Sequence, residues 1–431
     1  MLASRLFDDH AAKLALMCHL ASWLVFFMGS RTFSTSMEAP LSAAALVLWP
    51  TWVGKARGRY WPALACAACA CIIRPTAALY WLPLWLCELA VLDWGTRRHL
   101  YMSTAVVGAA ALVLSTALDS YMYSRTVLVP WRFISFNVLK SGASLFGVHG
   151  ALWYWYAGLP MVLATMTPFT FAGLATARHR AALPIAAASA CFIGALSATP
   201  HKEFRFLLPL VSPACIFAGA SLAQLGRIST KSAPRHVRVQ EPRVPLRLAC
   251  AVVVVPQLLG ALYASLIHQS APDVAMRHLA QAASSGRIGP GGILMLTPCH
   301  ETPGYSHLHA PVPLIILDCS PQWRAQSEAN ERDAFFKDPM GHLERRFADL
   351  SASGTGLWNG SEPWSERVGN AVPPPVGLPS VVVAYDDIAA VIEDALVKRW
   401  GYTLEKRIFH AQFAVDRDQR ALHIYYASRD E

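Results

Sequence analysis

The chain has 431 residues, of which 54% are hydrophobic and 15% are charged, and its formal net charge is +9. Soluble globular domains carry about 25% charged residues, so this composition excludes an ordinary soluble protein and predicts a polytopic membrane protein. The basic residues are spread over separate short loops and form no continuous stripe interleaved with aromatic residues, which gives no support to a nucleic-acid-binding function.

Apolar segments follow one another from about Leu14 to about Ile267, and they predict a transmembrane domain over residues 1–267. Several segments are shorter than the roughly 20 residues that cross a bilayer comfortably, so we expect these to be tilted or re-entrant. The first segment also resembles a signal peptide, but we interpret it as a membrane helix because its removal would disturb the topology described below. We predict about nine spans, at residues 14–29, 39–53, 60–73, 77–92, 100–117, 160–177, 181–198, 207–225 and 248–267.

The basic residues between the spans predict the orientation of the chain in the membrane. If the spans cross alternately, every basic cluster falls on one side, which the positive-inside rule assigns to the cytosol. These clusters are Lys55–Arg59, Arg97–His99, Arg178–Arg180 and a basic linker over residues 226–247. The opposite, lumenal side then receives the segments Arg31–Glu38, Arg74–Thr76, 118–159 and His201–Arg205, together with the whole C-terminal domain.

The lumenal segment 118–159 is rich in aromatic residues, with Trp131–Asn137 near its centre and Trp153–Tyr156 near its end. Trp and Tyr favour the headgroup level of a bilayer, and the portion 127–139 suits an amphipathic helix that lies along the membrane surface. Such a helix would guide a lipid substrate toward a cleft; an aromatic belt without a catalytic part is the alternative. Asp119, just past a span, is either a site carboxylate or an interface residue.

The segment His201-Lys-Glu-Phe-Arg-Phe206 places a dense cluster of charges between two long apolar runs. A single charge at the centre of a bilayer costs roughly 2.5–3.5 kcal/mol on insertion scales, so such a cluster belongs at a membrane interface or beside a site. With Pro200 in the first turn of a helix, His201 and Arg205 would share one face. This cationic face is suited to a lipid-linked phosphate, and a simple interfacial anchor is the alternative.

From residue 268 to residue 431 the sequence has spaced charges and turn residues, and it predicts a small α/β domain. No glycine-rich phosphate-binding motif occurs in the chain, so we predict no nucleotide site and no cofactor. Asp338-Pro339 is typical of a helix start, and Gly401 of a helix end. The expected helices cover residues 272–285, 338–350 and 387–400, and the expected strands cover residues 292–297, 312–319, 380–385, 407–414 and 422–427.

Two cysteines and one sequon agree with a lumenal C-terminal domain. Eight of the ten cysteines lie in apolar segments, where a free thiol packs as a small hydrophobic group, and only Cys299 and Cys319 lie in the C-terminal domain. In an oxidising lumen this pair is a disulfide candidate. Asn359-Gly-Ser361 is a glycosylation sequon that would be used only in the lumen.

Histidines gather in the loop that follows Cys299. His300, His307 and His309 are accompanied by Glu301, which makes a metal site conceivable. Their spacing matches no common zinc pattern, so we interpret the loop as a structured polar segment and predict no metal.

The segment His201–Phe206 resembles the HKE-x-RF signature of the glycosyltransferase family 22 mannosyltransferases, which use dolichyl phosphate mannose in the lumen of the endoplasmic reticulum. The resemblance runs from about residue 13 to near the C-terminus and is strongest to the branch that adds the third mannose in GPI-anchor assembly. The stretches that favour this branch are Ser30–Glu38, Ile73–Ala77, Asp119–Tyr123, Phe136–Leu139, Phe146–His149, Trp153–Tyr156, Gly158–Pro160, Pro298–His309 and Asp338–Pro339.

Membership of this family implies a multi-span membrane enzyme of the GT-C fold in the endoplasmic reticulum, with a lumenal α/β domain. It also implies an inverting transfer of an α-1,2-linked mannose from dolichyl phosphate mannose to the second mannose of the GPI precursor. The donor, the acceptor and membrane lipids are then the expected partners. By the same resemblance, the donor phosphate is expected to be bound by His201, Lys202, Arg205 and Arg74, and the cations or the acceptor to be oriented by Glu203, Glu38 and Asp119.

The start of the sequence departs from the family pattern. Family members carry their catalytic aspartate in a first lumenal loop with an H-P-D-E-like motif, after an initial membrane helix, and neither feature is present here. Asp8 and Asp9 would lie on the cytosolic side. The resemblance therefore predicts that the catalytic base lies upstream of Met1, and that these 431 residues by themselves lack full activity.

Other functions fit parts of the sequence. A related enzyme that acts on lipid-linked N-glycan precursors would share the HKE-x-RF signature, but the Pro298–His309 loop argues against it. A non-catalytic membrane partner would fit the missing base. A transporter would show internal repeats and a polar pathway through the spans, and we find neither in the sequence.

Overall fold

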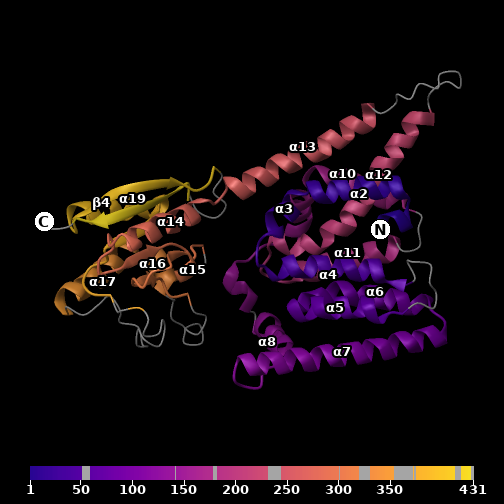
Figure 1. The fold of residues 1–431 in the computed structure, drawn as a ribbon, viewed down its shortest axis with the longest axis horizontal. Helices are drawn as coiled ribbons and strands as arrows, with labels where there is room; N and C mark the ends of the chain where they lie inside the picture. Colours follow the sequence, from indigo (N-terminus) through magenta and orange to yellow (C-terminus); the bar gives the residue numbers. More distant parts are fainter. Residues whose placement is uncertain are drawn as a thin grey trace. The chain divides into compact units, whose positions relative to one another are not determined.

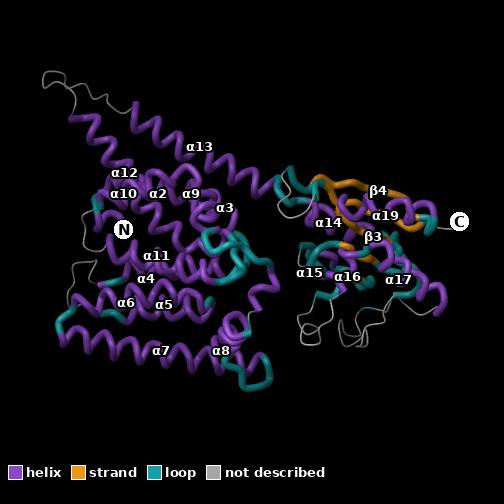
Figure 2. Tube along the Cα trace, turned by 180° about the vertical axis from the view of Figure 1, so that it is seen from behind, coloured by secondary structure: helices purple, strands orange, loops and turns teal. Residues whose placement is uncertain are grey.

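The computed structural model describes residues 1–50, 59–140, 142–177, 182–231, 244–299, 301–319, 331–353, 372, 375–412 and 419–428. The chain forms two compact units, Met1–Ser265 and Leu266–Glu431, which are described separately below. The first unit is built of helices, and the second combines helices with a β-sheet (Figure 1, Figure 2). The division falls close to the domain boundary that we predict at residue 267.

Every predicted membrane segment overlaps a helix of the first unit, as expected for apolar runs whose main-chain polar groups must be satisfied within the segment. The α-helices are α1 (Leu2–Leu6), α2 (Asp9–Ala21), α3 (Trp23–Gly29), α4 (Ser34–Leu48), α5 (Trp61–Ile73), α6 (Ala78–Val91), α7 (Trp94–Met122), α8 (Val129–Ile134), α9 (Leu159–Leu163), α10 (Thr167–Thr176), α11 (Ala182–Ala198), α12 (Leu208–Lys231) and α13 (Val244–Leu266). Short 3-10 or π-helical turns accompany them at η2 (Pro75–Ala77), η3 (Ser135–Leu139), η4 (Gly142–Phe146), η5 (Tyr154–Gly158), η6 (Ala164–Met166) and η7 (Phe204–Leu207).

Some of these helices are long and apolar enough to cross a membrane. Within the described residues there are four such segments: Trp94–Met122, Tyr154–Thr176, Phe204–Gly226 and Leu246–Ser284. Helices α2 and α3 together would form a fifth, bent by 57° where the extended backbone of Ser22 interrupts the helix. Shorter apolar helices lie where the sequence predicts short spans, at Trp61–Ile73, Pro75–Val91 and Ala182–Ala198. The chain is therefore a multi-pass membrane protein. Some of its apolar helices are long enough to cross a membrane alone, and others are shorter.

Helix α12 packs against α2, α4 and α10, and two glycines permit the closest of these contacts. A Cβ on Gly219 in α12 would lie 2.7 Å from the main-chain oxygen of Ala11 in α2. A Cβ on Gly173 in α10 would lie 2.6 Å from the main-chain carbonyl carbon of Phe217. Small residues at such positions let helix backbones approach each other closely in a membrane.

Replacing Gly219 with alanine is expected to destabilise the protein by about 1–3 kcal/mol, because the added methyl group forces two backbones apart. The matched control is Gly194→Ala in α11, where a Cβ would meet no atom within 4 Å. This control is expected to keep or slightly raise the melting temperature, because alanine favours helix more than glycine does. Equal melting temperatures of the two variants in detergent would contradict the close packing of α12.

The second unit is an α/β domain, as predicted. Its helices are α14 (Ala271–Ser284), α15 (Tyr305–Leu308), α16 (Glu331–Lys337), α17 (Pro339–Ser353) and α19 (Asp386–Lys398), and its strands are β1 (Ile293–Leu296), β2 (Leu314–Ile316), β3 (Val381–Tyr385), β4 (Tyr402–Phe409) and β5 (Ala421–Ala427). The sheet has the strand order β2-β1-β3-β5-β4. Strand β1 pairs in parallel with β2 and β3, and β5 pairs antiparallel with β3 and β4.

Helices cover both faces of the central strands β1 and β3. On one face α14 packs through Ala275, Met276 and Leu279, and on the other α17 and α19 pack through residues that include Leu343 and Ile392. A strand that is buried on both faces has a continuous apolar sequence. For this reason the positions of β1 and β3 are predicted well from the sequence.

The ends of several elements also follow their sequence signals. The Asp338 carboxylate accepts a hydrogen bond from the Gly341 main-chain nitrogen at 3.0 Å and so caps α17. Gly401 adopts a φ of +68° three residues after Lys398, the last residue of α19. Strand β4 begins at Tyr402, earlier than the predicted 407, because the exposed charges around Glu405 on this edge strand disguise it in the sequence. Helix α16 is not predicted from the sequence.

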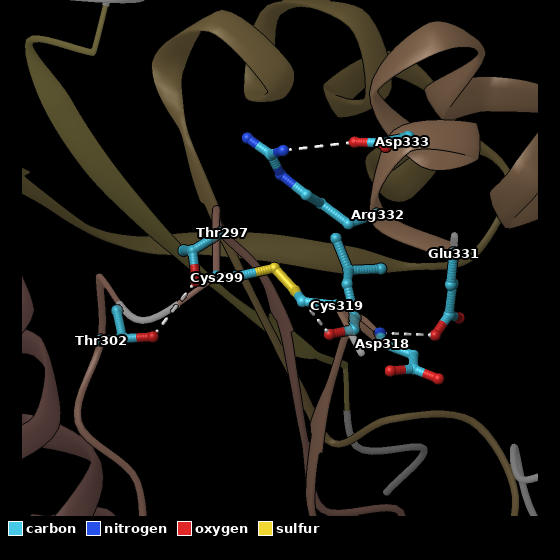
Figure 3. The surroundings of a disulfide bond; sticks show 9 residues. Thr297, Cys299, Thr302, Asp318, Cys319, Glu331, Arg332 and Asp333 are labelled. Atoms are coloured by element: carbon cyan, nitrogen blue, oxygen red, sulfur yellow. Dashed lines mark hydrogen bonds and ion pairs between the residues drawn. A yellow bond between two sulfur atoms is a disulfide. The ribbon is translucent and has the colours of Figure 1, made fainter. Parts of the chain in front are cut away.

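The predicted disulfide between Cys299 and Cys319 is present in the second unit (Figure 3). The two cysteines follow the adjacent parallel strands β1 and β2, and their Cα atoms lie 6.3 Å apart. Next to the bridge, the Asp318 main-chain nitrogen donates to Oε2 of Glu331 at 2.9 Å and ties this edge of the sheet to α16. Asn359 and His300, which the sequence singles out, lie outside the described residues.

Candidate active site

Three segments that the sequence places on the lumenal side meet in the first unit. They are the start of α4, the turn Arg74–Ala77 between α5 and α6, and the segment His201–Phe206 between α11 and α12. Ionic and cation–π contacts join five of their charged side chains into one group, which we call the arginine cluster: Glu38, Arg74, His201, Glu203 and Arg205. All five are residues that the sequence analysis selects.

Glu203 holds one half of the arginine cluster together. Its Oε1 atom lies 2.7 Å from Nε2 of His201 and accepts a hydrogen bond from Nη2 of Arg205 at 2.7 Å. The prediction that His201 and Arg205 share a helical face is wrong, because Glu203 has extended backbone angles and η7 begins only at Phe204. The carboxylate of Glu203 brings the two cations together in place of helical spacing.

Arg74 forms the other half of the arginine cluster. Its Nε atom lies 3.4 Å from Oε2 of Glu38 and donates to the Thr76 hydroxyl at 2.9 Å. Its guanidinium carbon lies 4.3 Å from the ring centre of Phe206, and that of Arg205 lies 5.8 Å from the same centre. The ring of Phe206 therefore links the two arginines, since guanidinium groups stack favourably on aromatic faces.

Arg205 is the most accessible member of the arginine cluster, and Glu38 is the most enclosed. The exposed side-chain fractions are 33% for Arg205 and 1% for Glu38. Burial raises the pKa of Glu38 to about 7, and the charge of Arg74 opposes this shift. Burial also raises the pKa of Glu203, but hydrogen bonds from His201 and Arg205 outweigh it and leave the pKa below its usual value. Glu203 is therefore a carboxylate at neutral pH.

Lys202 has a different environment from the other predicted phosphate ligands. It is 3% exposed, and its ammonium donates to the main-chain oxygens of Thr199 at 2.5 Å and His149 at 3.2 Å. The main-chain nitrogen of His149 in turn donates to the Pro200 oxygen at 3.0 Å. Lys202 thus fastens the aromatic segment before α9 to the His201–Phe206 segment.

Aromatic residues that the sequence analysis assigns no site role complete the surroundings of the arginine cluster. Tyr154 is fully buried, and its hydroxyl accepts a hydrogen bond from the Glu203 main-chain nitrogen at 3.3 Å. The rings of Trp153 and Phe204 have centres 4.8 Å apart, and Arg205 lies over the ring of Phe33 at 4.5 Å. The aromatic sequence Trp153–Tyr156 is the signal that could have marked these residues as part of the site. An aromatic belt at the membrane surface accounts for the same sequence equally well.

The other predicted acidic residues lie apart from the arginine cluster. Asp119 is in the last turn of α7, and in the described part of the chain no hydrogen bond or ion pair joins its side chain to the cluster. It stays a prediction for the acceptor side. Asp8 caps α2 by accepting from the Ala11 main-chain nitrogen at 2.8 Å, and Asp9 accepts from the Ser4 hydroxyl. Among the described residues no group of His, Cys, Asp and Glu could hold a metal ion.

This arrangement is suited to an anion with several oxygen atoms. Two guanidinium groups can each offer two parallel N–H donors to a phosphate, and their planes are fixed by Glu203, Glu38 and the aromatic rings. The arginine cluster can therefore bind a phosphate-like anion at the ends of apolar helices.

Comparison with known proteins identifies the family. A model of the Alg9-like mannosyltransferase family matches residues 1–309. The mannosyltransferase APTG1 of Arabidopsis thaliana is 33% identical over 438 residues, which cover 99% of this chain and 74% of the relative. GPI alpha-1,2-mannosyltransferase 3 is 31% identical in Danio rerio, over 96% of this chain and 69% of the relative, and 31% identical in Homo sapiens, over 83% of this chain and 61% of the relative.

The fold is shared with a solved structure. ArnT from Cupriavidus metallidurans superposes with a TM-score of 0.53 and 14% sequence identity, over 99% of this chain and 80% of that protein. This likeness agrees with the GT-C fold that the sequence predicts, with a helical membrane domain followed by a small domain. The chain thus belongs to the Alg9-like mannosyltransferase family and is a membrane-bound glycosyltransferase of the GT-C fold.

Proposed function

We propose that this protein adds the third, α-1,2-linked mannose to the GPI precursor in the lumen of the endoplasmic reticulum, with dolichyl phosphate mannose as the donor. The relatives named GPI alpha-1,2-mannosyltransferase 3 support the reaction. The observation that carries the donor assignment is the arginine cluster, where Arg74 and Arg205 lie at the ends of membrane helices and on one aromatic ring.

In this reaction an acceptor hydroxyl oxygen bonds to the anomeric carbon of mannose while the bond from that carbon to the phosphate oxygen breaks. Attack from the opposite face inverts the anomeric centre. The departing dolichyl phosphate gains negative charge, which preorganised N–H donors stabilise more strongly than water does. Arg205 and Arg74 supply these donors, and His201 lies beside them with its Nε2 atom 2.7 Å from Oε1 of Glu203. The acceptor hydroxyl loses its proton to the aspartate that the family resemblance implies.

In this proposal the two carboxylates of the arginine cluster orient the cations that bind the phosphate. Glu203 binds both His201 and Arg205 and so sets where their N–H groups point. Oε2 of Glu38 lies 3.4 Å from Nε of Arg74 and holds this guanidinium on the ring of Phe206. Both are positioning residues, since neither needs to touch the substrate.

A lumenal C-terminal unit is part of the proposal and is supported by the disulfide Cys299–Cys319, because disulfides persist in the oxidising lumen. We expect the sequon at Asn359 to be glycosylated in microsomes, so that endoglycosidase H increases the mobility of the protein on a gel. The Asn359→Gln variant is expected to run at the deglycosylated position without treatment. A wild-type protein that the glycosidase does not shift, and that added protease cleaves within the C-terminal unit in sealed microsomes, would place this unit in the cytosol.

The function is tested in cells that lack GPI alpha-1,2-mannosyltransferase 3. The whole coding sequence of the gene's transcript is expressed in these cells. The lipid-linked GPI precursors are then analysed by mass spectrometry. We expect the precursor with two mannoses to disappear and GPI-anchored proteins to return to the cell surface. Persistence of that precursor with full expression of the protein would reject the proposed reaction. Restoration of N-glycan precursors in cells that lack the corresponding enzyme would support the alternative acceptor.

A further inference from the structure

A short aromatic segment, which begins at His149 and ends at Tyr154, is held beside the arginine cluster. His149 is bound through main-chain atoms only: its nitrogen donates to the Pro200 oxygen at 3.0 Å, and its oxygen accepts from Lys202 at 3.2 Å. At the other end of the segment, the Tyr154 hydroxyl accepts from the main-chain nitrogen of Glu203, a member of the cluster, at 3.3 Å. The side chain of His149 takes no part in this fastening.

Two side chains of the aromatic segment form what we call the His149–Trp153 pair. Their ring centres lie 4.9 Å apart, and the planes of the rings are tilted by 30°. Trp153 also packs on Phe204, the residue before Arg205, with ring centres 4.8 Å apart. His149 is exposed and Trp153 is partly exposed. Among the described residues, no hydrogen bond or ion pair engages the imidazole nitrogens of His149 or the indole nitrogen of Trp153.

An accessible aromatic pair with free ring nitrogens has the chemistry of a sugar-binding surface. A pyranose ring presents C–H groups on its face, which pack on an aromatic ring, and hydroxyl groups around its edge, which form hydrogen bonds. The side chains of Trp and His combine a flat ring with a polar atom at its rim, so each can make both kinds of contact. Aromatic walls with a few well-placed polar groups are typical of sites for small organic ligands.

We propose that the His149–Trp153 pair binds the mannose that carries the attacking hydroxyl. The inference rests on the proposed function and names the residues that hold the acceptor in that reaction. The attacking oxygen must approach to about 3–3.5 Å from the anomeric carbon, which is bonded to the phosphate on the arginines. The acceptor mannose therefore lies beside the arginine cluster, where the pair is placed by the contact of Trp153 with Phe204. The donor is anchored by its charged phosphate, whereas this uncharged sugar needs a surface of aromatic and hydrogen-bonding groups.

The variant His149→Ala tests the pair and leaves the fastening intact, because only main-chain atoms of His149 bind Lys202 and Pro200. We expect the KM for the GPI precursor with two mannoses to rise at least about tenfold, since one hydrogen bond and one ring contact are lost. The kcat is expected to stay near the wild-type value, because the loss is one of acceptor binding. Rates are measured at saturating donor in microsomes of cells that express the whole coding sequence.

Two further variants serve as rescue and control. His149→Gln is expected to recover part of the affinity, because an amide both donates and accepts hydrogen bonds. Val148→Ala is the matched control, since Val148 is 68% exposed and precedes His149 in the same segment. We expect the KM of this control to equal that of the wild type.

A second measurement is independent of mannose transfer. Diethyl pyrocarbonate modifies accessible imidazoles, and the purified chain in lipid nanodiscs is treated with it in the presence and absence of the two-mannose precursor. We expect the precursor, at about ten times its dissociation constant, to slow the modification of His149 by about tenfold. His10, an exposed histidine of α2, is expected to react at the same rate in both samples. The modified peptides are quantified by mass spectrometry.

An unchanged KM in His149→Ala, an equal rise in Val148→Ala, or a loss of kcat alone overturns the inference. Protection of His149 by dolichyl phosphate mannose that equals or exceeds protection by the precursor assigns the pair to the donor and also overturns it. Mannose transfer by the wild type without protection of His149 rejects the inference alone. Protection by the precursor without any transfer rejects the proposed reaction alone.

Discussion

Replacing Arg205 with alanine is expected to lower mannose transfer by about 100- to 1,000-fold, the range for removal of one preorganised donor to a developing negative charge. Arg205 is the most exposed cation of the arginine cluster, and Glu203 fixes its guanidinium plane. The Arg205→Lys variant is expected to recover only part of this loss, because a lysine offers a point charge in place of two parallel donors. The rate is measured in microsomes of the complemented cells with labelled donor.

The control for this experiment is Arg277→Ala in the second unit. Arg277 is 67% exposed and pairs with Asp273, and an exposed pair of this kind contributes about 0–1 kcal/mol to stability. We expect transfer by this variant to equal that of the wild type. If Arg205→Ala and Arg277→Ala show the same rate at equal protein levels, Arg205 does not stabilise the leaving phosphate.

The melting temperature of the wild-type protein is expected to fall between pH 4.5 and pH 7 through the ionisation of Glu38. Glu38 precedes the predicted span at residues 39–53, and burial raises its pKa from 4.5 to about 7. A carboxyl group with a raised pKa contributes stability that is fully present below its unfolded value and is lost as the pH rises through its folded value. A pKa shift of this size corresponds to about 3 kcal/mol in the free energy of unfolding, because each pKa unit is worth about 1.36 kcal/mol.

The Glu38→Gln variant isolates this contribution, because glutamine keeps the shape of the side chain and does not ionise. Its melting temperature is expected to depend less steeply on pH than that of the wild type over the same window. Below pH 4.5 the two proteins are expected to melt at similar temperatures. If the melting temperatures of the two proteins changed with pH in parallel, Glu38 would not have a raised pKa. The description of Glu38 as an enclosed carboxyl group beside Arg74 would then be wrong.

The sequence predicts the elements that have a strong periodic or compositional signal. Each apolar run became a helix, and the strands β1 and β3 were recognised because burial on both faces makes their sequences uniformly apolar. Strand β4 was only partly recognised, since its exposed charges resemble those of a loop. The disulfide was predictable because Cys299 and Cys319 are the only cysteines of the second unit.

The composition of the arginine cluster was predictable, but its geometry was not. Charged residues between apolar runs marked all of its members, and the positive-inside rule brought Glu38, Arg74 and His201 to the same side. The role of Glu203 as the link between His201 and Arg205 depends on an extended backbone at that residue, which the helical interpretation missed. The contact of Lys202 with two main-chain oxygens depends on the tertiary position of His149, which no local pattern encodes.

The central claim is that Arg74 and Arg205 bind the phosphate of a lipid-linked mannose. The most direct test is the affinity of the purified chain in lipid nanodiscs for tritiated dolichyl phosphate mannose, measured for the wild type, for Arg74→Gln and Arg205→Gln, and for the double variant. We predict at least about a tenfold loss for each single variant, competition by dolichyl phosphate, and less than additive losses in the double variant, because both side chains contact one phosphate. Equal affinity of the wild type and the double variant would contradict the claim.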